Sequence, residues 1–358
     1  MDTWTHHRSL LLLLLNLLLQ LPSLNSIDTI VGLRKETSES ESCNFFEGSW
    51  VEDDSYPLYE DCKFIDAGLN CQKNGRSDEL YLKYKWQPTN CDLQRFDGEA
   101  FLRKFRGKKI MFVGDSLGSN QWQSLACILL TTAPNSNYTV SRKPNRSDLS
   151  FPDYEMDVIF LKNGFLVDLV DEEAGRVLKL DSLNRSKQWE GVDILIFNSY
   201  HWWIHTGRLK TWDYFQVGDN LYHEMDRMEA YRIALTTWAN WVDSRVDPSR
   251  TRVFYQGITA VHYNGSEWDE PAVQDCKRQR KPIEGSSFPG RRYAGEAVVK
   301  EVLGNMTNTV YLLDITLMTQ LRKDGHPSIY AGVGVDCSHW CVPGVPDAWN
   351  QILYSLLI

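Results

Sequence analysis

The stretch Lys108–Ser116, with the sequence KKIMFVGDS, is the segment that decides the fold. Its apolar run Lys109–Val113 is typical of a buried strand, and a turn of small residues follows it. Helical spacing then begins near Ser119 and continues to Leu130. A buried strand, a tight turn and a helix form the repeating unit of a parallel sheet covered by helices. The stretch therefore predicts an α/β fold that presents Ser116 at the carboxyl end of a strand, the edge where such sheets bind ligands.

The same alternation of short apolar runs and amphipathic stretches extends from about residue 95 to residue 358. Further strands are expected at Met156–Leu161, Asp193–Phe197, Arg252–Tyr255 and Thr309–Leu313. Helices are expected at Ser119–Leu130, Glu224–Val246, Ala294–Leu303 and Asp347–Leu357. We therefore predict that residues 95–358 form one main domain, with a central parallel sheet flanked by helices on both faces.

A second stretch, Asp336–Cys341 with the sequence DCSHWC, places an acid and an imidazole three residues apart near the C-terminus. A serine hydroxyl becomes a good nucleophile when an imidazole takes its proton, and an acid holds that imidazole in the required tautomer. Ser116, His339 and Asp336 supply these three groups. We therefore predict a catalytic triad for acyl transfer.

The oxyanion that forms during acyl transfer needs N–H donors around it. We expect the backbone N–H of Ser116, at the start of a helix, and the side-chain amide of Asn198, at the end of a strand, to provide them. Further contacts with the oxyanion or the substrate are predicted from residues inside the same motifs: Gly114, Asp115, Asn120 and Trp340. His201 and His205 are alternative bases, but no acid lies at a useful spacing from either, so His339 is preferred.

Two other interpretations of these motifs are weaker. Residues 114–118 also match Gly-x-Ser-x-Gly, the nucleophile elbow of α/β-hydrolases. In that fold the acid and the histidine usually come from separate segments, whereas Asp336 and His339 share one turn, as in the GDSL or SGNH hydrolases. Cys337, His339 and Cys341 could bind zinc, but no second Cys-x-x-Cys pair completes four ligands, and we predict no metal.

The composition restricts the partners of the chain. Its 358 residues carry a formal net charge of −9, which disfavours nucleic acid as a partner. The 13 tryptophans exceed what a core usually needs, and some of them could stack on sugar rings. The basic stretch Cys276–Lys281 could contact an acidic polymer such as pectin, although a solvated loop is the preferred interpretation.

The N-terminus indicates export. Residues 1–26 contain the leucine run Leu10–Leu21, which is too short to span a bilayer and is typical of a signal peptide or an uncleaved signal-anchor. Residues 27–42 are acidic and serine-rich, and we predict a disordered linker. Residues 43–94 hold four cysteines among loop-forming residues, which predicts a disulfide-stapled cap packed on the main domain.

The cysteine count and the glycosylation sequons agree with export. All eight cysteines lie beyond the leader, and an even count in an exported chain predicts four disulfides. Five Asn-x-Ser/Thr sequons predict N-glycosylation at Asn137, Asn145, Asn184, Asn264 and Asn305.

The chain resembles the plant trichome birefringence-like proteins. Val113–Leu125 resembles their GDS block, Phe197–Trp203 their Asn-centred block and Asp336–Asn350 their C-terminal Asp-x-x-His block. Cys43–Trp86 is similar to their cysteine-rich entry region. Many members carry an arginine where this chain has Ser119, and many carry a longer N-terminal region with a full membrane anchor. The second difference makes a soluble, apoplastic enzyme a stronger alternative.

The resemblance implies an SGNH-like catalytic domain that O-acetylates cell-wall polysaccharides in the Golgi. It implies that Ser116 is the nucleophile, His339 the base and Asp336 the orienting acid. It also implies four disulfide pairs: Cys43–Cys91, Cys62–Cys127, Cys71–Cys341 and Cys276–Cys337.

We therefore predict an O-acetyltransferase that moves an acetyl group through Ser116 onto hydroxyls of xylan, mannan, xyloglucan or pectin. The expected partners are this polysaccharide and an acetyl donor, either acetyl-CoA or another carrier, with no tightly bound cofactor and membrane association only through the N-terminal segment. The first alternative is a polysaccharide acetylesterase with the same triad, and the second is a non-catalytic binder of wall polysaccharide. The expected location is the Golgi lumen or membrane, or the apoplast if the leader is cleaved.

Overall fold

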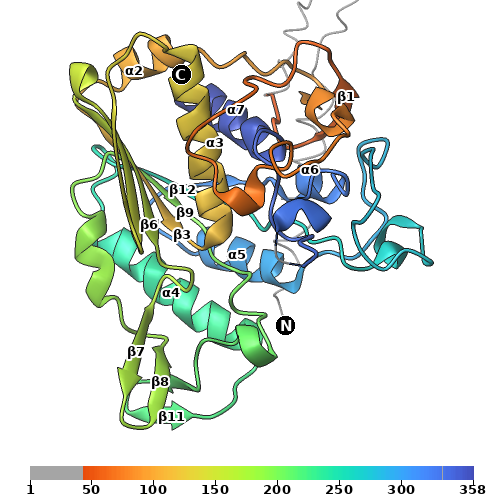
Figure 1. Ribbon diagram of the computed structural model, residues 1–358. Helices are drawn as coiled ribbons and strands as arrows, with labels where there is room; N and C mark the ends of the chain where they lie inside the picture. Colours follow the sequence, from red (N-terminus) through yellow and green to blue (C-terminus); the bar gives the residue numbers. More distant parts are fainter. Residues whose placement is uncertain (1–42, 333) are drawn as a thin grey trace, which may run out of the picture. The chain divides into compact units, whose positions relative to one another are not determined.

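The computed structural model describes residues 43–332 and 334–358 (Figure 1). The predicted leader and linker fall on residues 1–42, outside the described residues. The helices are α2 (Gly98–Lys104), α3 (Ser116–Thr132), α4 (Arg227–Arg245), α5 (Ala294–Gly304), α6 (Thr316–Gln320) and α7 (Val345–Leu357). Among the described helices, none is long and apolar enough to cross a membrane.

Within the described residues, thirteen strands form three sheets. The central sheet contains β3 (Lys109–Gly114), β4 (Thr139–Lys143), β5 (Arg146–Phe151), β6 (Met156–Lys162), β9 (Ile194–Phe197), β12 (Arg252–Gln256) and β13 (Val310–Leu313). A second sheet contains β7 (Asp168–Glu172), β8 (Gly175–Lys179), β10 (Tyr214–Val217) and β11 (Asn220–Tyr222). The third pairs β1 (Gly48–Glu52) with β2 (Tyr84–Pro88).

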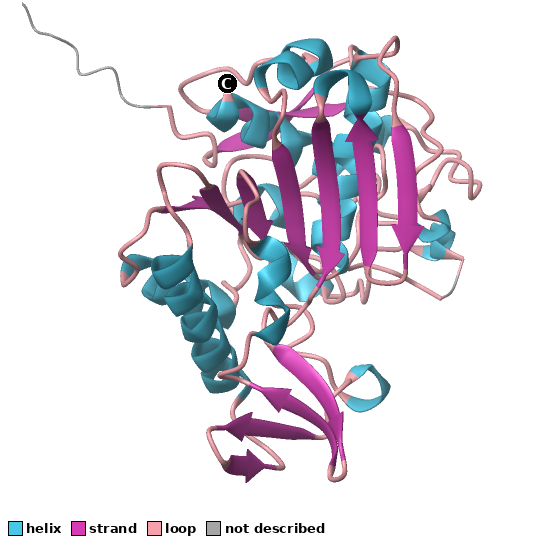
Figure 2. Ribbon diagram, turned by 90° about the vertical axis from the view of Figure 1, so that its left-hand side faces the viewer, coloured by secondary structure: helices cyan, strands magenta, loops and turns pink. Residues whose placement is uncertain are grey.

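The central sheet has the strand order β13-β12-β9-β3-β6-β5-β4. Figure 2 draws the strands of the sheets in magenta. The five predicted strands, from β13 to β6, all pair in parallel, as expected. The sheet is nevertheless mixed, because β5 and β4 extend it with antiparallel pairing. Sequence analysis missed these two strands because β4 is largely exposed and carries no apolar run.

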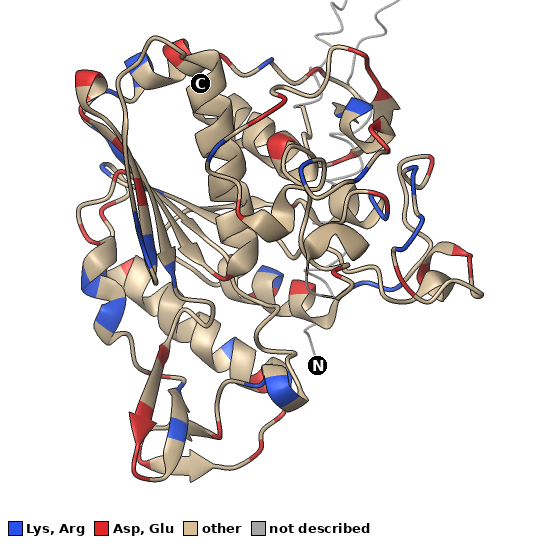
Figure 3. Ribbon diagram, viewed as in Figure 1, with Lys and Arg blue, Asp and Glu red and all other residues tan. Residues whose placement is uncertain are grey.

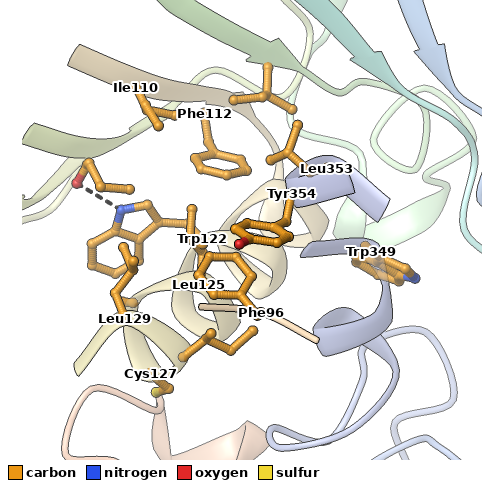
Figure 4. Packing of buried hydrophobic residues seen from close by; sticks show 14 of the residues in the cluster. Phe96, Ile110, Phe112, Trp122, Leu125, Cys127, Leu129, Trp349, Leu353 and Tyr354 are labelled. Carbon is orange, nitrogen blue, oxygen red and sulfur yellow. Dashed lines mark hydrogen bonds between the residues drawn. The ribbon is translucent and has the colours of Figure 1, made fainter. Parts of the chain in front are cut away.

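Helices cover both faces of the central sheet, and alternate residues of β3 show how. Ile110 and Phe112 pack in one core with residues of α2, α3 and α7 (Figure 4). Met111 and Val113 point to the opposite face and pack with residues of α4 and α5. This two-fold alternation is the expected consequence of a strand buried on both sides.

The first core also fixes α3 to the sheet. The Trp122 side chain is buried there, and its Nε1–H donates to the Val158 carbonyl of β6 at 3.0 Å. A buried indole N–H needs a partner, and this bond sets the rotation of α3 about its axis. The N-terminus of α3, where Ser116 stands, is thereby held at the sheet edge.

The N-terminal segment, residues 43–94, is joined to the rest of the described chain by disulfides and by hydrogen bonds. Its disulfides are Cys43–Cys91, Cys62–Cys127 and Cys71–Cys341, and the fourth bond is Cys276–Cys337. These are the pairs that the family resemblance implied. The Tyr59 hydroxyl also donates to the buried Asp347 carboxylate at the start of α7, at 2.7 Å.

Candidate active site

Ser116 begins α3 directly after β3 ends, and the turn between them is fixed by Asp115. The Asp115 carboxylate is fully buried and accepts the N–H of Leu117 at 2.8 Å, which caps the helix. An N-cap aspartate satisfies one of the otherwise unpaired N–H groups of the first helical turn. Asp115 is therefore a structural cap behind the serine, and Ser116 itself stays partly exposed.

The predicted triad is assembled as a chain of hydrogen bonds. The Ser116 Oγ lies 2.7 Å from His339 Nε2, across 223 residues of sequence. The His339 Nδ1 lies 2.7 Å from Asp336 Oδ2. Because the carboxylate can only accept, Nδ1 carries the proton and Nε2 is left to accept from the serine hydroxyl. This is the tautomer that activates a serine.

The Asp336 carboxylate organises the turn that carries both residues. Its Oδ1 accepts the N–H groups of Ser338 and His339 at 2.9 and 3.0 Å, and the Ser338 hydroxyl at 2.9 Å. Partial burial acts to raise the pKa of Asp336. The hydrogen bond and charge of His339, with the two N–H groups, outweigh burial and hold this pKa well below its usual value.

The electrostatics of His339 suit a base. Burial acts to lower the pKa of His339, but the hydrogen bond and charge of Asp336, with the charge of Asp115, raise it above its usual value. A raised pKa strengthens the proton affinity of Nε2 while leaving it in the range of general bases.

Asn120 and Trp340 were predicted to contact the oxyanion or the substrate, but both are enclosed in the protein. The Asn120 side chain is fully buried, accepts the Trp340 N–H at 3.0 Å and donates to the Trp340 carbonyl at 3.1 Å. The Trp340 ring is also fully buried, and it stacks on His326 with 4.1 Å between ring centroids. We assign to both residues the role of holding the turn Asp336–His339, called the catalytic turn below, against α3.

Asn198 lies beside the serine turn, as predicted for the end of β9. Its Nδ2 donates to Asp115 Oδ1 at 2.6 Å. An amide nitrogen carries two hydrogens, so one remains to donate elsewhere. A Cβ at Gly114 or Gly118 would lie 1.7 or 2.2 Å from Asn198 Oδ1. Both positions must be glycine for Asn198 to reach this place.

Sequence analysis did not identify two further polar residues near this edge. Gln256 ends β12 and Thr259 follows it, and both are buried. They line a cavity of about 10 Å³ with Leu117, Asn198 and His201. The Gln256 Oε1 and Thr259 Oγ1 atoms have no hydrogen-bond partner among the described residues. Neither residue belongs to a motif, so only the strand-end position of Gln256 could have drawn attention to it.

The alternative bases and the zinc interpretation receive no support from the geometry. Burial lowers the pKa of His201 and that of His205, and no carboxylate in the described part of the chain forms a hydrogen bond with either ring. Cys337 and Cys341 are both in disulfides, so neither sulfur is free to bind a metal. No group of three potential metal ligands occurs in the described part of the chain.

The predicted glycosylation sites lie on the surface. Their asparagine side chains are all exposed: Asn137, Asn145, Asn184, Asn264 and Asn305. Exposure is required for the modification, which itself remains a prediction.

Comparison with known proteins assigns the chain to a family. The GDSL/SGNH-like acyl-esterase family found in Pmr5 and Cas1p matches residues 93–356, and the PMR5 N-terminal domain matches residues 41–92. The chain is 54% identical to protein trichome birefringence-like 42 of Arabidopsis thaliana, over 98% of this chain and 99% of that protein.

The chain belongs to the trichome birefringence-like family. It is also 48% identical to protein trichome birefringence-like 41 of Arabidopsis thaliana, over 100% of this chain and 99% of that protein. With protein trichome birefringence from the same plant it shares 38% identity, over 93% of this chain and 60% of that protein. The trichome birefringence-like chain thus has a GDSL/SGNH-like acyl-esterase domain, and its four disulfides fit a protein of the secretory pathway.

Proposed function

We propose that this protein is an O-acetyltransferase that modifies hydroxyls of plant cell-wall polysaccharide in the secretory pathway. The observation that carries the proposal is the hydrogen-bonded chain from Ser116 through His339 to Asp336. These three residues stand at the carboxyl end of the parallel strands of the central sheet, in a domain of the acyl-esterase family.

The proposed reaction has two displacements. In the first, Ser116 Oγ attacks the acetyl carbonyl carbon, His339 Nε2 takes the serine proton, and the donor's leaving group departs with that proton. In the second, a sugar hydroxyl attacks the acetyl-serine ester, gives its proton to His339, and Ser116 regains it. The Ser116 N–H and the second N–H of the Asn198 amide are the proposed oxyanion donors. The acetyl donor is acetyl-CoA or another carrier.

A polysaccharide acetylesterase is the second candidate, because water could replace the sugar in the second displacement. The side chains of His339 and Asp336 are 29% and 22% exposed. Water therefore has access to the base that would activate it. The two enzymes share every residue named above and differ in whether the acceptor excludes water from the acetyl-serine.

The charge around the catalytic turn favours an acidic acceptor such as pectin. Residues 276–292 contain six cationic residues and one acidic residue, in a chain of net charge −9 (Figure 3). The Cys276–Cys337 disulfide joins this segment to the turn that carries His339. Arg280 and Lys281 are exposed and form no ion pair with any residue that the structure describes, so their charges are available to a polymer.

The deciding experiment is mass spectrometry of xylan and homogalacturonan oligomers after incubation with the glycosylated protein and an acetyl donor. A gain of one acetyl on an oligomer, lost in Ser116→Ala, supports the transferase and names its polymer. Acetyl loss from acetylated oligomers without gain supports the esterase. No change in either, with oligomer binding retained in Ser116→Ala, would move the non-catalytic binder ahead.

The acceptor preference has its own charge test. The double variant Arg280→Gln, Lys281→Gln should raise the KM for homogalacturonan at low salt and leave the KM for neutral xylan oligomers unchanged. Lys277→Gln is the matched control, because Lys277 is already paired with Asp275 at 3.0 Å. Equal effects of the double variant on both polymers would contradict an acidic preference.

A further inference from the structure

A buried pair of histidines lies directly behind the catalytic turn. His262 and His326 are each only 1% exposed, and His262 Nδ1 lies 2.7 Å from His326 Nε2. Their outer nitrogens both meet backbone carbonyls. His262 Nε2 lies 2.9 Å from the Gln320 carbonyl, and His326 Nδ1 lies 2.6 Å from the His339 carbonyl.

These three contacts, which involve all four ring nitrogens, fix how many protons the two rings carry. A carbonyl only accepts, so His262 Nε2 and His326 Nδ1 must each hold a proton. Two neutral rings would then place bare lone pairs against each other at 2.7 Å. A third proton between Nδ1 and Nε2 turns that repulsion into a hydrogen bond. Rotating either ring by half a turn would place ring carbons at these short distances. A different ring orientation therefore does not remove the repulsion between the two lone pairs.

The pair is connected to the backbone of the catalytic turn at three points. The His326 ring donates to the His339 carbonyl, and the His262 backbone N–H donates to the Cys337 carbonyl at 2.9 Å. Ser328, two residues after His326, exchanges two backbone bonds with Asp336, at 2.7 and 3.0 Å. A change in the distance between the two rings is therefore transmitted to both Asp336 and His339.

The surroundings both support and oppose a positive charge here. Support comes from the carboxylates of Asp324 and Asp336 and from the Trp340 ring stacked on His326. Opposition comes from burial and from nearby cations. Burial lowers the pKa of His262 to about 4 and that of His326 well below its usual value. The opposing charged groups are Lys323 and His339, and Arg76 donates to the His326 carbonyl at 3.2 Å.

We propose that His262 and His326 share a third ring proton in this conformation, and that the proton-bridged pair is a positioning element for the catalytic turn. The third proton comes from solvent under acidic conditions and returns to it as the pH rises. The two rings then separate, and the support of the His339 carbonyl weakens. The pair touches no reacting atom, so it acts through His339 and Asp336. Its effect on rate rests on the proposed acyl chemistry, but its proton count does not.

Selective ¹⁵N-histidine NMR of the folded protein tests the proton count without any substrate. We expect both nitrogens of both rings to be protonated or proton-sharing at acidic pH, and one ring proton to be lost as the pH rises. The His339 signals should change in the same pH range. Two neutral rings at every pH at which the protein is folded would overturn the proposal.

Two variants test the consequence for the reaction. In His262→Asn, the amide N–H can donate to the bare Nε2 of a neutral His326, so no third proton is needed. The loss of rate that the proposal predicts for the natural protein at alkaline pH should therefore disappear in this variant. In His326→Phe, the stack on Trp340 can remain but the donor to His339 is lost. We expect kcat to fall about tenfold with little change in KM, which corresponds to one hydrogen bond of about 1.4 kcal/mol.

The matched control is His223→Asn, an exposed histidine that contacts Tyr214 on the second sheet. It should leave the pH profile unchanged. An unaltered pH profile in His262→Asn, with the fold intact by thermal unfolding, would contradict the positioning role. If no acyl chemistry is found with any substrate, the NMR result still decides the proton count, so failure of the proposed function is distinguishable.

Discussion

Asp336 performs two tasks with its two oxygens. Oδ2 holds the His339 ring, while Oδ1 collects three hydrogen bonds from within the same turn. The first task sets the tautomer of the base, and the second sets where the backbone places it. Both depend on ionised carboxylate oxygens, which the low pKa of Asp336 provides.

Replacing Asp336 with asparagine should separate these tasks. The bond and charge of Asp336 raise the pKa of His339 against burial. In Asp336→Asn that pKa should fall, so the acidic limb of kcat/KM moves to lower pH. The plateau rate should fall on the order of 10⁴-fold, as in other serine triads, because the tautomer is lost. A pH–rate profile measures both effects.

Ser338→Ala is the control in the same turn, because it leaves the Asp336 charge in place. It removes one of the three bonds to Asp336 Oδ1 and the 3.5 Å contact between the Ser338 hydroxyl and His339 Nδ1. We expect its acidic limb to stay in place and its rate to change by less than about tenfold. A limb that moves in Ser338→Ala but not in Asp336→Asn would show that the charge of Asp336 is not what sets the pKa of His339.

At the scale of elements, the junction of β3, α3 and β9 depends on two glycines, which have no side chain. Gly114 ends β3 and Gly118 lies in the first turn of α3, and Asn198 occupies the space that their Cβ atoms would fill. Helix propensity alone favours alanine over glycine at position 118 by about 1 kcal/mol. The close approach of Asn198 reverses that preference.

Gly118→Ala should therefore be destabilising, by about 1–3 kcal/mol from overpacking, and should abolish most of the activity by displacing Asn198. Thermal unfolding and kcat/KM measure the two effects. Gly304→Ala, at the end of α5, is the matched control, because no atom lies within 4 Å of its added methyl group. A neutral Gly118→Ala would mean that Asn198 moves at little cost and is not required in this position.

At the scale of the whole molecule, one buried carboxylate joins three distant parts of the chain. Asp347 lies in the first turn of α7 and accepts bonds from Tyr59 in the N-terminal segment at 2.7 Å and from Ser124 in α3 at 2.6 Å. Burial raises the pKa of Asp347 to about 6, although these bonds and the Gly344 N–H lower it. The folded protein therefore binds the Asp347 proton more tightly than the unfolded chain, where an aspartate titrates near 3.9.

The stability contribution of Asp347 follows from this difference. It is fully present below about pH 4 and is lost as the pH rises through about 6, by about 3 kcal/mol in total. Asp347→Asn cannot titrate, so the difference in unfolding free energy between the natural protein and this variant should shrink by that amount from pH 4 to pH 7. Denaturant unfolding at the two pH values measures it.

The exposed Asp219→Asn variant is the control, and its pH dependence should match that of the natural protein. A difference between the natural protein and Asp347→Asn that stays constant from pH 4 to pH 7 would show that Asp347 is ionised throughout and that burial does not govern it.

The sequence by itself determined the features that rest on local physics. Short continuous apolar runs that alternate with helical stretches predicted the five parallel strands, because a strand buried on both faces carries apolar residues on both sides. The three-residue spacing of Asp336 and His339 predicted their pairing, since the bonds that form that turn join residues one turn apart. The motifs also placed Ser116 at a strand end.

Only the tertiary structure decided what long-range contacts create. The strands β4 and β5 pair by backbone bonds at a sheet edge and need no apolar signature. Asn120 and Trp340 lie in the motifs that carry the triad, yet their bonds across 220 residues make them packing groups and not substrate contacts. His262 and His326 lie 64 residues apart in the sequence, and no sequence pattern connects them. Each of these depends on which polar atoms the fold brings within hydrogen-bond distance, and a linear pattern does not contain that information.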